Sequence, residues 1–280
     1  LQLAIIALLQ GTTEWLPVSS SGHVLLAAGF FEASPGDELL INAVSNLGTL
    51  LAMLIYFRKD VTSAIAGGFE LVAAPVSKSP LSKGARLAAA VIVATPVAVL
   101  VAFAYEKFLP DSMLESMRSI YVVAATTIIF GALLWWADVK GARDRREEDM
   151  TMWHAFLIGA TQAIAAILPG TSRSGITMTA ARAFGYDRTE AARFSMLIGA
   201  PILAAAGLYG AMGLVTADAT ETVLHLKDGL IVASIAFITG LASIWFLMSL
   251  LSRMSFLPFV LYRFALGAVL ILGSPLVGLL

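Results

Sequence analysis

Residues 167–177 read ILPGTSRSGIT, and this stretch decides how the rest of the chain is interpreted. Apolar sequence precedes it and largely apolar sequence follows it. A proline and two glycines break the helix here, and four hydroxyls and one guanidinium tolerate a bilayer only in a cavity lined by protein. Arg173 offers a rigid fork of donors suited to a phosphate, and hydroxyls with backbone N–H groups can complete a cradle. A hydroxyl-rich turn alone is more typical of a loop at a membrane surface, so a second observation is needed.

That observation is a related stretch, residues 10–23, which reads QGTTEWLPVSSSGH. When the two stretches are aligned on their glutamines and prolines, Ser-Ser-Ser-Gly (19–22) falls on Ser-Arg-Ser-Gly (172–175) after a slip of one residue. Each copy is an apolar half-helix that carries a glutamine, followed by a proline and a hydroxyl-rich break. Paired broken helices in corresponding halves of a membrane protein indicate a site at the repeat interface.

Composition places the chain among polytopic helical membrane proteins. Of its 280 residues, 59% are hydrophobic and 13% are charged, and the mean hydropathy is +0.86. A soluble domain of this length needs more charge on its surface. The formal net charge of −1 gives no indication of a nucleic-acid partner, and the absence of cysteine excludes disulfides and thiolate metal sites.

We expect one integral, all-α membrane domain over residues 1–280, with two re-entrant helix pairs and six transmembrane helices. Residues 1–9 are apolar but too short to cross a core of roughly 30 Å, so they begin the first re-entrant pair, and residue 150 begins the second. The expected spans are 39–57, 86–105, 118–136, 188–213, 229–251 and 256–279. The halves, about 1–137 and 150–280, each hold three spans, and an odd number of crossings inverts the second half relative to the first.

Lysine and arginine gather in the loops at 58–86 and 138–149. The positive-inside rule puts these loops in the cytoplasm and both termini outside. The segment 138–149 is the most charged part of the chain, and we expect a solvated linker there. Arg182, Arg188 and Arg193 are expected to anchor the chain at the membrane interface.

Glu14 and His23 are the candidate acid–base groups. Gln10 and Glu14 share one helical face, and a carboxylate within an apolar half-helix commonly faces a cavity, although exposure at the membrane surface is an equal alternative. Glu14 can accept a proton or bind a hard cation such as Mg²⁺ or Ca²⁺. His23 can act as a general acid or nucleophile, but a lone histidine is more often a hydrogen-bonded structural residue. Arg263, deep in the last span, can pair with a carboxylate or extend to the interface.

With these residues laid out, the chain resembles the undecaprenyl-diphosphatase family, also called the bacitracin-resistance family of membrane phosphatases. The resemblance covers nearly the whole chain and is carried mainly by residues 10–23 and by PGTSRSGIT at 169–177. Weaker matches are NLGTLLA at 46–52, ARFSMLI at 192–198 and FLPFVLYRF at 256–264.

The resemblance implies a phosphatase of the plasma (inner) membrane. Its substrate would be undecaprenyl diphosphate, a polyprenyl diphosphate drawn from the lipid bilayer, and removal of the terminal phosphate would recycle the lipid carrier of cell-wall peptidoglycan synthesis. Resistance to the antibiotic bacitracin goes with that activity. The implied fold has six spans and two re-entrant pairs in inverted repeat, with the site opening to the outer face, and a homo-oligomer is compatible with it.

By position, the family's acidic motif falls on Gln10 and Glu14, its serine on Ser20, its histidine on His23 and its phosphate-binding loop on residues 172–177. The expected catalytic residues are therefore Glu14, Ser20, His23 and Arg173. The expected substrate-binding residues are Gln10, Ser19, Ser21, Gly170, Thr171, Ser172, Ser174 and Thr177.

The chain departs from the family's pattern at three amides. Gln10 stands where many members have a second glutamate, and Asn42 and Asn46 stand where an acid and a glutamine are expected. Mg²⁺ or Ca²⁺ at Glu14 is therefore expected with its stoichiometry open. Ser20 is the preferred nucleophile, with His23 or water as the alternatives. The rival class is an inverted-repeat transporter or flippase for a phosphorylated lipid, which needs an anion-binding arginine but no carboxylate, serine and histidine together.

Overall fold

The computed structural model describes residues 2–28, 35–73, 80–216 and 226–273, and within these ranges the regular structure is helical. The first half holds α1 (Gln2–Thr13), α2 (Ser20–Ala28), α3 (Pro35–Tyr56), α4 (Arg58–Ala73), α5 (Lys83–Ala94), α6 (Pro96–Phe108), α7 (Asp111–Met117) and α8 (Ile120–Lys140). The second half holds a 3₁₀ turn (Glu147–Asp149), α9 (Met152–Ala160), α10 (Gln162–Ile167), α11 (Arg173–Ala183), α12 (Arg188–Thr216), α13 (Leu226–Leu251) and α14 (Leu257–Gly273).

Four of the described helices are long and apolar enough to cross a membrane: Lys83–Tyr105, Ile120–Lys140, Arg188–Leu208 and Lys227–Leu251. Residues 41–73 form a helix pair bent by 90° between α3 and α4, which raises the number to five if the pair is one span. The predicted all-helical, polytopic class is confirmed. α3 begins at Pro35, four residues before the predicted start of the first span at residue 39, and proline is favoured in the first turn of a helix. The predicted last span extends past Gly273, outside the described residues.

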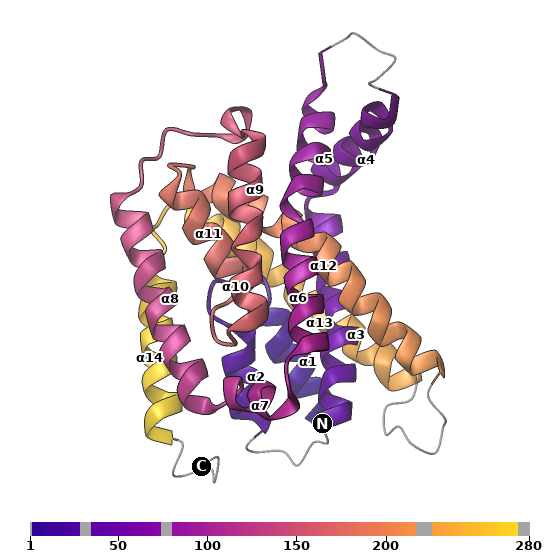
Figure 1. Cartoon of the computed structure of the whole chain (residues 1–280), viewed down its shortest axis with the longest axis vertical. Helices are drawn as coiled ribbons and strands as arrows, with labels where there is room; N and C mark the ends of the chain where they lie inside the picture. Colours follow the sequence, from indigo (N-terminus) through magenta and orange to yellow (C-terminus); the bar gives the residue numbers. More distant parts are fainter. Residues whose placement is uncertain (1, 29–34, 74–79, 217–225, 274–280) are drawn as a thin grey trace.

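Two broken helices enter the molecule from opposite ends, as Figure 1 shows. The chain runs inward along α1 and returns along α2 at the end where α14 finishes. It runs inward again along α9 and α10 from the other end, where α4 and α5 project, and returns along α11. The pairs expected to begin at residues 1 and 150 are therefore present as helix–break–helix units.

Long helices enclose these two units. α13 packs on α3 and α1, α12 packs on α3, and α14 packs on α8. The contact between α3 and α13 is a backbone contact, because a Cβ on Gly48 would lie 2.2 Å from the carbonyl oxygen of Ala233. Small residues permit this close approach between membrane helices. Trp15 and Leu16 are buried in the central apolar cluster, so α1 ends inside the protein.

The charged end of the molecule is held together by ion pairs. Lys83 on α5 pairs with Glu148 at 2.6 Å, and Arg193 on α12 pairs with Asp60 and with Glu147. These pairs join α4, α5 and α12 to the segment between α8 and α9, so the two lysine- and arginine-rich loops lie at one end. The expectation that Arg193 anchors the chain at the membrane interface is therefore wrong, because carboxylates of the same chain neutralise its charge.

The expectation of a solvated linker from residue 138 onward is also wrong at its start. α8 continues to Lys140, and Asp138 is buried between Arg182 at 3.0 Å and Arg188 at 2.7 Å. A carboxylate inside a protein needs such partners, because its desolvation is otherwise uncompensated. Arg182 and Arg188 thus connect α8, α11 and α12 instead of anchoring the chain to headgroups.

Candidate active site

We define the first break as residues 14–19, between α1 and α2, and the second break as residues 168–172, between α10 and α11. Both end in the same turn. Ser19 and Ser172 have positive φ angles of 72° and 66°, which are uncommon for residues other than glycine. Each serine immediately precedes a helix and accepts a hydrogen bond from the third residue along, Gly22 at 3.4 Å and Gly175 at 3.1 Å. One helix-capping turn is therefore built twice.

The breaks are joined by a reciprocal pair of hydrogen bonds. The backbone N–H of Gly170 donates to Ser21 Oγ at 3.0 Å, and Ser174 Oγ donates to the carbonyl of Leu16 at 3.0 Å. Each returning helix thus contributes one serine that satisfies a backbone group of the opposite break. A broken helix in a membrane needs such partners for its freed N–H and C=O groups.

Arg263 on α14 connects the same two breaks from a third element of the fold. Its guanidinium donates to the carbonyls of Pro17 in the first break and of Gly170 and Thr171 in the second, at 3.3, 3.0 and 3.0 Å. It also donates to the backbone of α8 at residues 126 and 127. Among the described residues it pairs with no carboxylate and is fully buried, so it neither extends to the interface nor forms the expected ion pair.

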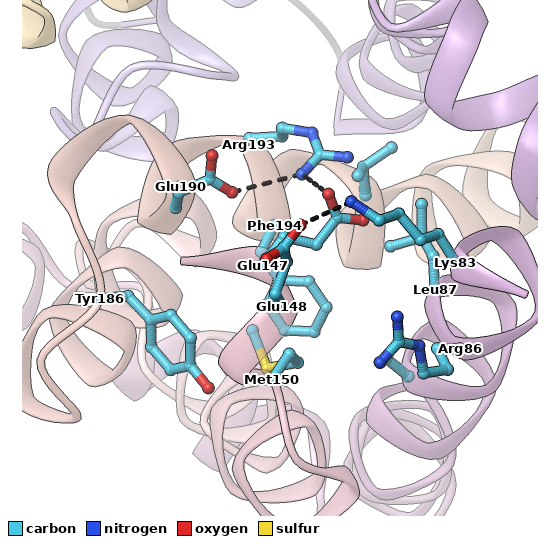
Figure 2. A pocket seen from close by; sticks show the side chains of 12 residues that line it. Lys83, Arg86, Leu87, Glu147, Glu148, Met150, Tyr186, Glu190, Arg193 and Phe194 are labelled. Atoms are coloured by element: carbon cyan, nitrogen blue, oxygen red, sulfur yellow. Dashed lines mark hydrogen bonds and ion pairs between the residues drawn. The ribbon is translucent and has the colours of Figure 1, made fainter. Parts of the chain in front are cut away.

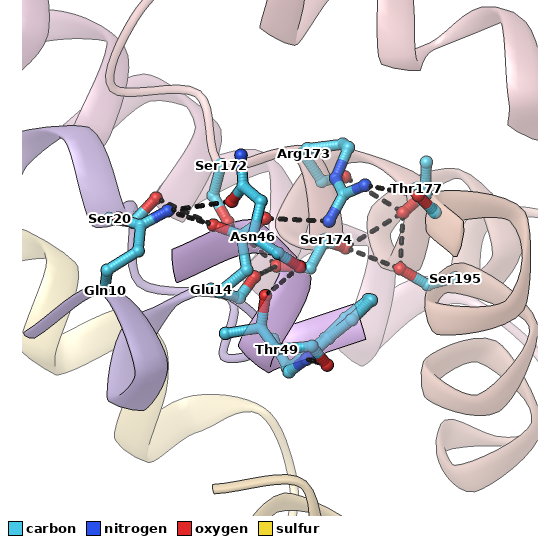
Figure 3. A network of polar contacts seen from close by, with 12 residues as sticks. Gln10, Glu14, Ser20, Asn46, Thr49, Ser172, Arg173, Ser174, Thr177 and Ser195 are labelled. Atoms are coloured by element: carbon cyan, nitrogen blue, oxygen red, sulfur yellow. Dashed lines mark hydrogen bonds and ion pairs between the residues drawn. The ribbon is translucent and has the colours of Figure 1, made fainter. Parts of the chain in front are cut away.

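Glu14 is the centre of the polar network that lies between the breaks (Figure 3). One carboxylate oxygen accepts a hydrogen bond from Arg173 at 2.8 Å, and the other accepts from Gln10 at 2.8 Å and from Ser20 at 3.4 Å. The Gln10 amide also reaches Asn46 on α3 at 3.4 Å. The side chains of Glu14 and Arg173 are only 11% and 16% exposed, so little solvent screens their attraction. The structure therefore brings together a base, a hydroxyl and a cation.

Arg173 is held in a fixed orientation. It donates to the carbonyl of Gly199 on α12 at 2.8 Å, and its guanidinium lies 5.4 Å from the centre of the Trp15 ring. Trp15 in turn donates to the backbone of Thr49 at 3.1 Å. A Cβ on Gly199 would lie 2.7 Å from a guanidinium nitrogen, so this arrangement requires glycine there. A guanidinium has five N–H groups, and the contacts to Glu14 and Gly199 leave donors for a phosphate.

His23 stands apart from this network. Its Nδ1 lies 2.7 Å from the carbonyl of Ser19, and its Nε2 lies 2.6 Å from the hydroxyl of Tyr262. A carbonyl only accepts, so the hydrogen-bond pattern assigns the proton to Nδ1 and makes Tyr262 the donor to Nε2. In the described part of the chain, no hydrogen bond joins His23 to Glu14, Ser20 or Arg173. His23 can reach a substrate only if the Tyr262 contact opens.

The expected substrate-binding residues divide by exposure. Ser20, Ser172 and Arg173 are partly exposed and Ser21 is exposed, whereas Ser19, Gly170, Thr171, Ser174 and Thr177 are buried. Thr177 contacts Ser195 Oγ at 2.6 Å and donates to the carbonyl of Arg173. The buried hydroxyls of Ser174 and Thr177 thus support the backbone of the second break, and the partly exposed side chains of Ser20, Ser172 and Arg173 present donors to a ligand.

Three residues that hold side chains of the candidate site in place were not predicted from the sequence: Ser195, Gly199 and Tyr262. Gly199 and Ser195 lie in an apolar span, where a glycine or serine usually reports helix packing. The Gly-Ala-Pro at 199–201 is a local signal of an irregular helix in that span, and Tyr262 is adjacent to Arg263 in sequence.

The oxygens around Glu14 suit a hard cation that is shared with a substrate. The described residues contain no cluster of three or more His, Cys, Asp or Glu side chains that could hold a metal. Glu14 supplies one carboxylate, and Ser20 and Asn46 supply neutral oxygens near it, whereas Gln10 turns its amide nitrogen toward Glu14 and Asn46. Mg²⁺ commonly binds one or two carboxylates and completes its shell with substrate phosphates and water, so this donor set fits such an ion.

The family model described as "Bacitracin resistance protein BacA" matches residues 3–269 of the chain. The undecaprenyl-diphosphatase of Hyphomonas neptunium is 64% identical over 277 residues, which cover 99% of this chain and 97% of that protein. The undecaprenyl-diphosphatase of Maricaulis maris is 43% identical over 270 residues, covering 96% and 97% of the two chains. That of Ruegeria pomeroyi is 42% identical over 270 residues, covering 96% of each.

Proposed function

The chain belongs to the bacitracin resistance protein BacA family, and from that premise we infer that it hydrolyses undecaprenyl diphosphate to the monophosphate and inorganic phosphate. The reaction returns the lipid carrier of cell-wall synthesis to use. One observation carries the assignment: Glu14 contacts both Ser20 and Arg173, so a base, a nucleophile and a phosphate-binding cation share one site. A transporter or flippase needs the cation but has no use for a serine held against a carboxylate, and it is not favoured.

The arrangement supports attack by Ser20 on the terminal phosphorus. As the Ser20 oxygen forms its bond to phosphorus, its proton passes to Glu14, 3.4 Å away, and the bond from phosphorus to the bridging oxygen breaks. Undecaprenyl monophosphate leaves, and water then hydrolyses the phosphoserine to release inorganic phosphate and restore the hydroxyl. The alternative is direct attack by a water that Glu14 deprotonates, with Ser20 as a phosphate ligand.

Arg173 supplies the charge that this reaction needs. Negative charge spreads over the oxygens of the transferred phosphoryl group, and a fixed guanidinium stabilises it without reorganisation. Arg173 is fixed by Gly199 and Trp15 and pairs with the carboxylate that Ser20 also contacts, so its remaining donors would bind the phosphate near that hydroxyl. Glu14 and its neutral oxygen neighbours would hold a Mg²⁺ or Ca²⁺, which when bound would offset the charge of the diphosphate.

His23 and Tyr262 form a pair suited to the leaving group. The bridging oxygen of the diphosphate needs neutralisation when its bond to phosphorus breaks. Tyr262 points its proton at His23 Nε2, so the pair can pass a proton toward that oxygen once the substrate separates them. Hydrogen bonding from His23 to a phosphate oxygen is the alternative role.

We also propose that residues 1–137 and 150–280 are inverted repeats, each with a re-entrant pair and three spans in a single membrane domain. The duplicated turn at Ser19 and Ser172 and the opposite entry of the two pairs support this. Six spans result if α3 and α14 both cross the plasma (inner) membrane. The lysine- and arginine-rich end then lies in the cytoplasm, and both termini and the site opening lie on the outer face.

Phosphate release from undecaprenyl diphosphate by purified protein in detergent tests the activity. Steady release that saturates with substrate is the expected result, and binding without release would favour the transporter. The chain has no cysteine, so cysteines placed at Ser112 and Ala142 test the topology on intact cells with an impermeant thiol reagent. Labelling at 112 alone is expected, and labelling at 142 alone would invert the orientation.

A further inference from the structure

A pocket that is separate from the proposed active site opens at the charged end of the molecule. It lies between the start of α5, the start of α12 and the segment at 147–150, with an empty volume of about 560 Å³ that includes space open to the outside. Its rim is charged, with Lys83, Arg86, Glu147, Glu148, Glu190 and Arg193. Its base is apolar, with Leu87, Ala90, Met150, Phe194 and Leu197.

The polarity of this pocket follows the axis of the two helices that line it. On α5 the charged Lys83 and Arg86 precede Leu87 and Ala90 by one turn, and the same order recurs on α12. Both helices begin at the charged end and belong to candidate membrane spans. The pocket therefore has its charges at headgroup level and its apolar base on the hydrocarbon side. A water-soluble anion would gain nothing from that base, whereas a lipid would use both parts.

The two sides of the rim differ in charge (Figure 2). On the α12 side, Arg193 alone faces two carboxylates of the rim, Glu147 at 2.9 Å and Glu190 at 3.3 Å. It also pairs with Asp60 of α4, which lies outside the pocket lining. On the α5 side, Lys83 pairs with Glu148 at 2.6 Å, and Arg86 is exposed. In the described part of the chain, the Arg86 side chain forms no hydrogen bond or ion pair, although its charge acts on Lys83 and Glu148. One side thus offers a guanidinium whose hydrogen-bond donors have no protein partner, and the other side has an excess of carboxylate.

We propose that this pocket binds a phospholipid whose headgroup carries both a phosphate and a primary ammonium, as in phosphatidylethanolamine. The phosphate would lie on Arg86, the ammonium would face the carboxylates on the α12 side, and the first part of an acyl chain would cover the apolar base. An anionic headgroup would satisfy Arg86 but would face surplus carboxylate. A quaternary ammonium has no N–H groups and could not donate hydrogen bonds to the carboxylates. The site is distinct from the proposed diphosphatase site and does not depend on it.

The test measures lipid binding to purified, delipidated protein in a non-ionic detergent by native mass spectrometry. The probes are phosphatidylethanolamine, phosphatidylglycerol and phosphatidylcholine with identical acyl chains, together with inorganic phosphate. Phosphatidylethanolamine should bind most tightly. Arg86→Gln should weaken it about fivefold, the scale expected for one basic group near a headgroup. Glu190→Gln should lower its preference over phosphatidylcholine.

Arg58→Gln is the matched control, because Arg58 is an exposed arginine at the start of α4 that does not line the pocket. It should change binding by less than about twofold, as expected for an exposed charge. Equal losses in Arg86→Gln and Arg58→Gln would overturn the proposal, and so would phosphatidylglycerol or inorganic phosphate binding as tightly as phosphatidylethanolamine. Phosphate release from undecaprenyl diphosphate should be unchanged in all three variants, so the outcome is independent of the diphosphatase assignment.

Discussion

The two breaks share a backbone and differ in chemistry. Both end in a serine with positive φ that caps the following helix. Each of these helices also carries a serine that forms a hydrogen bond with the backbone of the other break. The residue that starts the helix differs: Ser20 in one case and Arg173 in the other. The same turn therefore presents a hydroxyl from one side and a guanidinium from the other, and the carboxylate of Glu14 lies between them.

The difference assigns distinct tasks to the two breaks. The first break and the helix after it carry the groups proposed to exchange protons, Glu14, Ser20 and His23, and the helix after the second break begins with a fixed positive charge. In the alignment of the two stretches, His23 corresponds to the apolar Ile176 on α11. The helix after the second break therefore has no comparable proton carrier at this position. A site between two similar turns can thus place proton transfer on one side and charge stabilisation on the other. Both contribute to the catalysis of phosphoryl transfer.

Replacing the base should have the largest effect on activity. Glu14→Gln retains the shape of the side chain but cannot accept the proton of Ser20 or water. Phosphate release should fall by about 10² to 10⁴-fold, the range for loss of a general base. Circular dichroism and thermal unfolding should show a folded protein, and Glu70→Gln on α4 is the control. Turnover within tenfold of the parent would remove proton transfer from the first break.

The second break should be nearly as sensitive to the shape of its cation. Arg173→Lys retains the charge but loses the fork that can hold two phosphate oxygens, so it should behave almost like Arg173→Ala. We expect kcat to fall by about 10² to 10³-fold, with a smaller rise in KM, because the contact matters most in the transition state. Arg253→Lys, in the exposed turn after α13, should behave like the parent. A kcat for Arg173→Lys within about threefold of the parent would indicate a loop anchor.

Ser20→Ala distinguishes covalent from direct hydrolysis at the first break. If Ser20 is the nucleophile, the variant should lose at least about a hundredfold in phosphate release, since water must replace a positioned hydroxyl. A phosphoserine should also be trapped on acid quenching of the parent enzyme but not of the variant. Near-normal release by Ser20→Ala would leave attack by water as the mechanism.

Moving Arg173 without changing it should have an intermediate effect. Gly199→Ala places a Cβ 2.7 Å from a guanidinium nitrogen, so the side chain must shift. We expect about a tenfold fall in kcat with little change in KM, because small displacements of positioned groups slow catalysis. Gly68→Ala is the matched control, since a Cβ on this helical glycine of α4 meets nothing within 4 Å. Equal kinetics in the two variants would contradict the role of Gly199.

The smallest effect on activity is expected at the two reciprocal serines. Ser21→Ala leaves the N–H of Gly170 unpaired, whereas Ser174→Ala removes one of two donors to the carbonyl of Leu16, which keeps the N–H of Val18. Ser21→Ala should lose about 1–3 kcal/mol of stability and Ser174→Ala about 0.5–1.5 kcal/mol in a denaturant titration, while phosphate release changes little. Similar losses would support equivalent roles for the two serines, and a loss in only one would show that the two breaks are supported unequally.

The sequence predicted the polytopic class, both breaks and the meeting of Glu14, Ser20 and Arg173. These predictions succeed because apolar length and broken helices are local signals. The burial of Asp138 was not predictable in this way, since a charged residue after an apolar run has the same sequence signature whether it is solvated or paired. Its state depends on which helices meet, and Arg182 and Arg188 come from other elements.

The same limit applies within the site. Gly199 was missed because any glycine in an apolar span is explained by helix packing, and only the fold brings it against Arg173. His23 was expected among the catalytic groups from its position after the serines. The structure instead pairs it with Tyr262, which is 239 residues away in the chain. Contacts across such separations leave no periodic pattern in a single sequence.

The place of Arg263 has a consequence for how the protein is made. Membrane helices are synthesised in order, and α14 is the last described helix to leave the ribosome. The guanidinium that holds the carbonyls of both breaks, and the tyrosine that holds His23, arrive with it. The carbonyls of the two breaks therefore lack these donors until α14 has been synthesised. Assembly of both breaks is therefore expected to depend on α14, although neither break is close to it in the sequence.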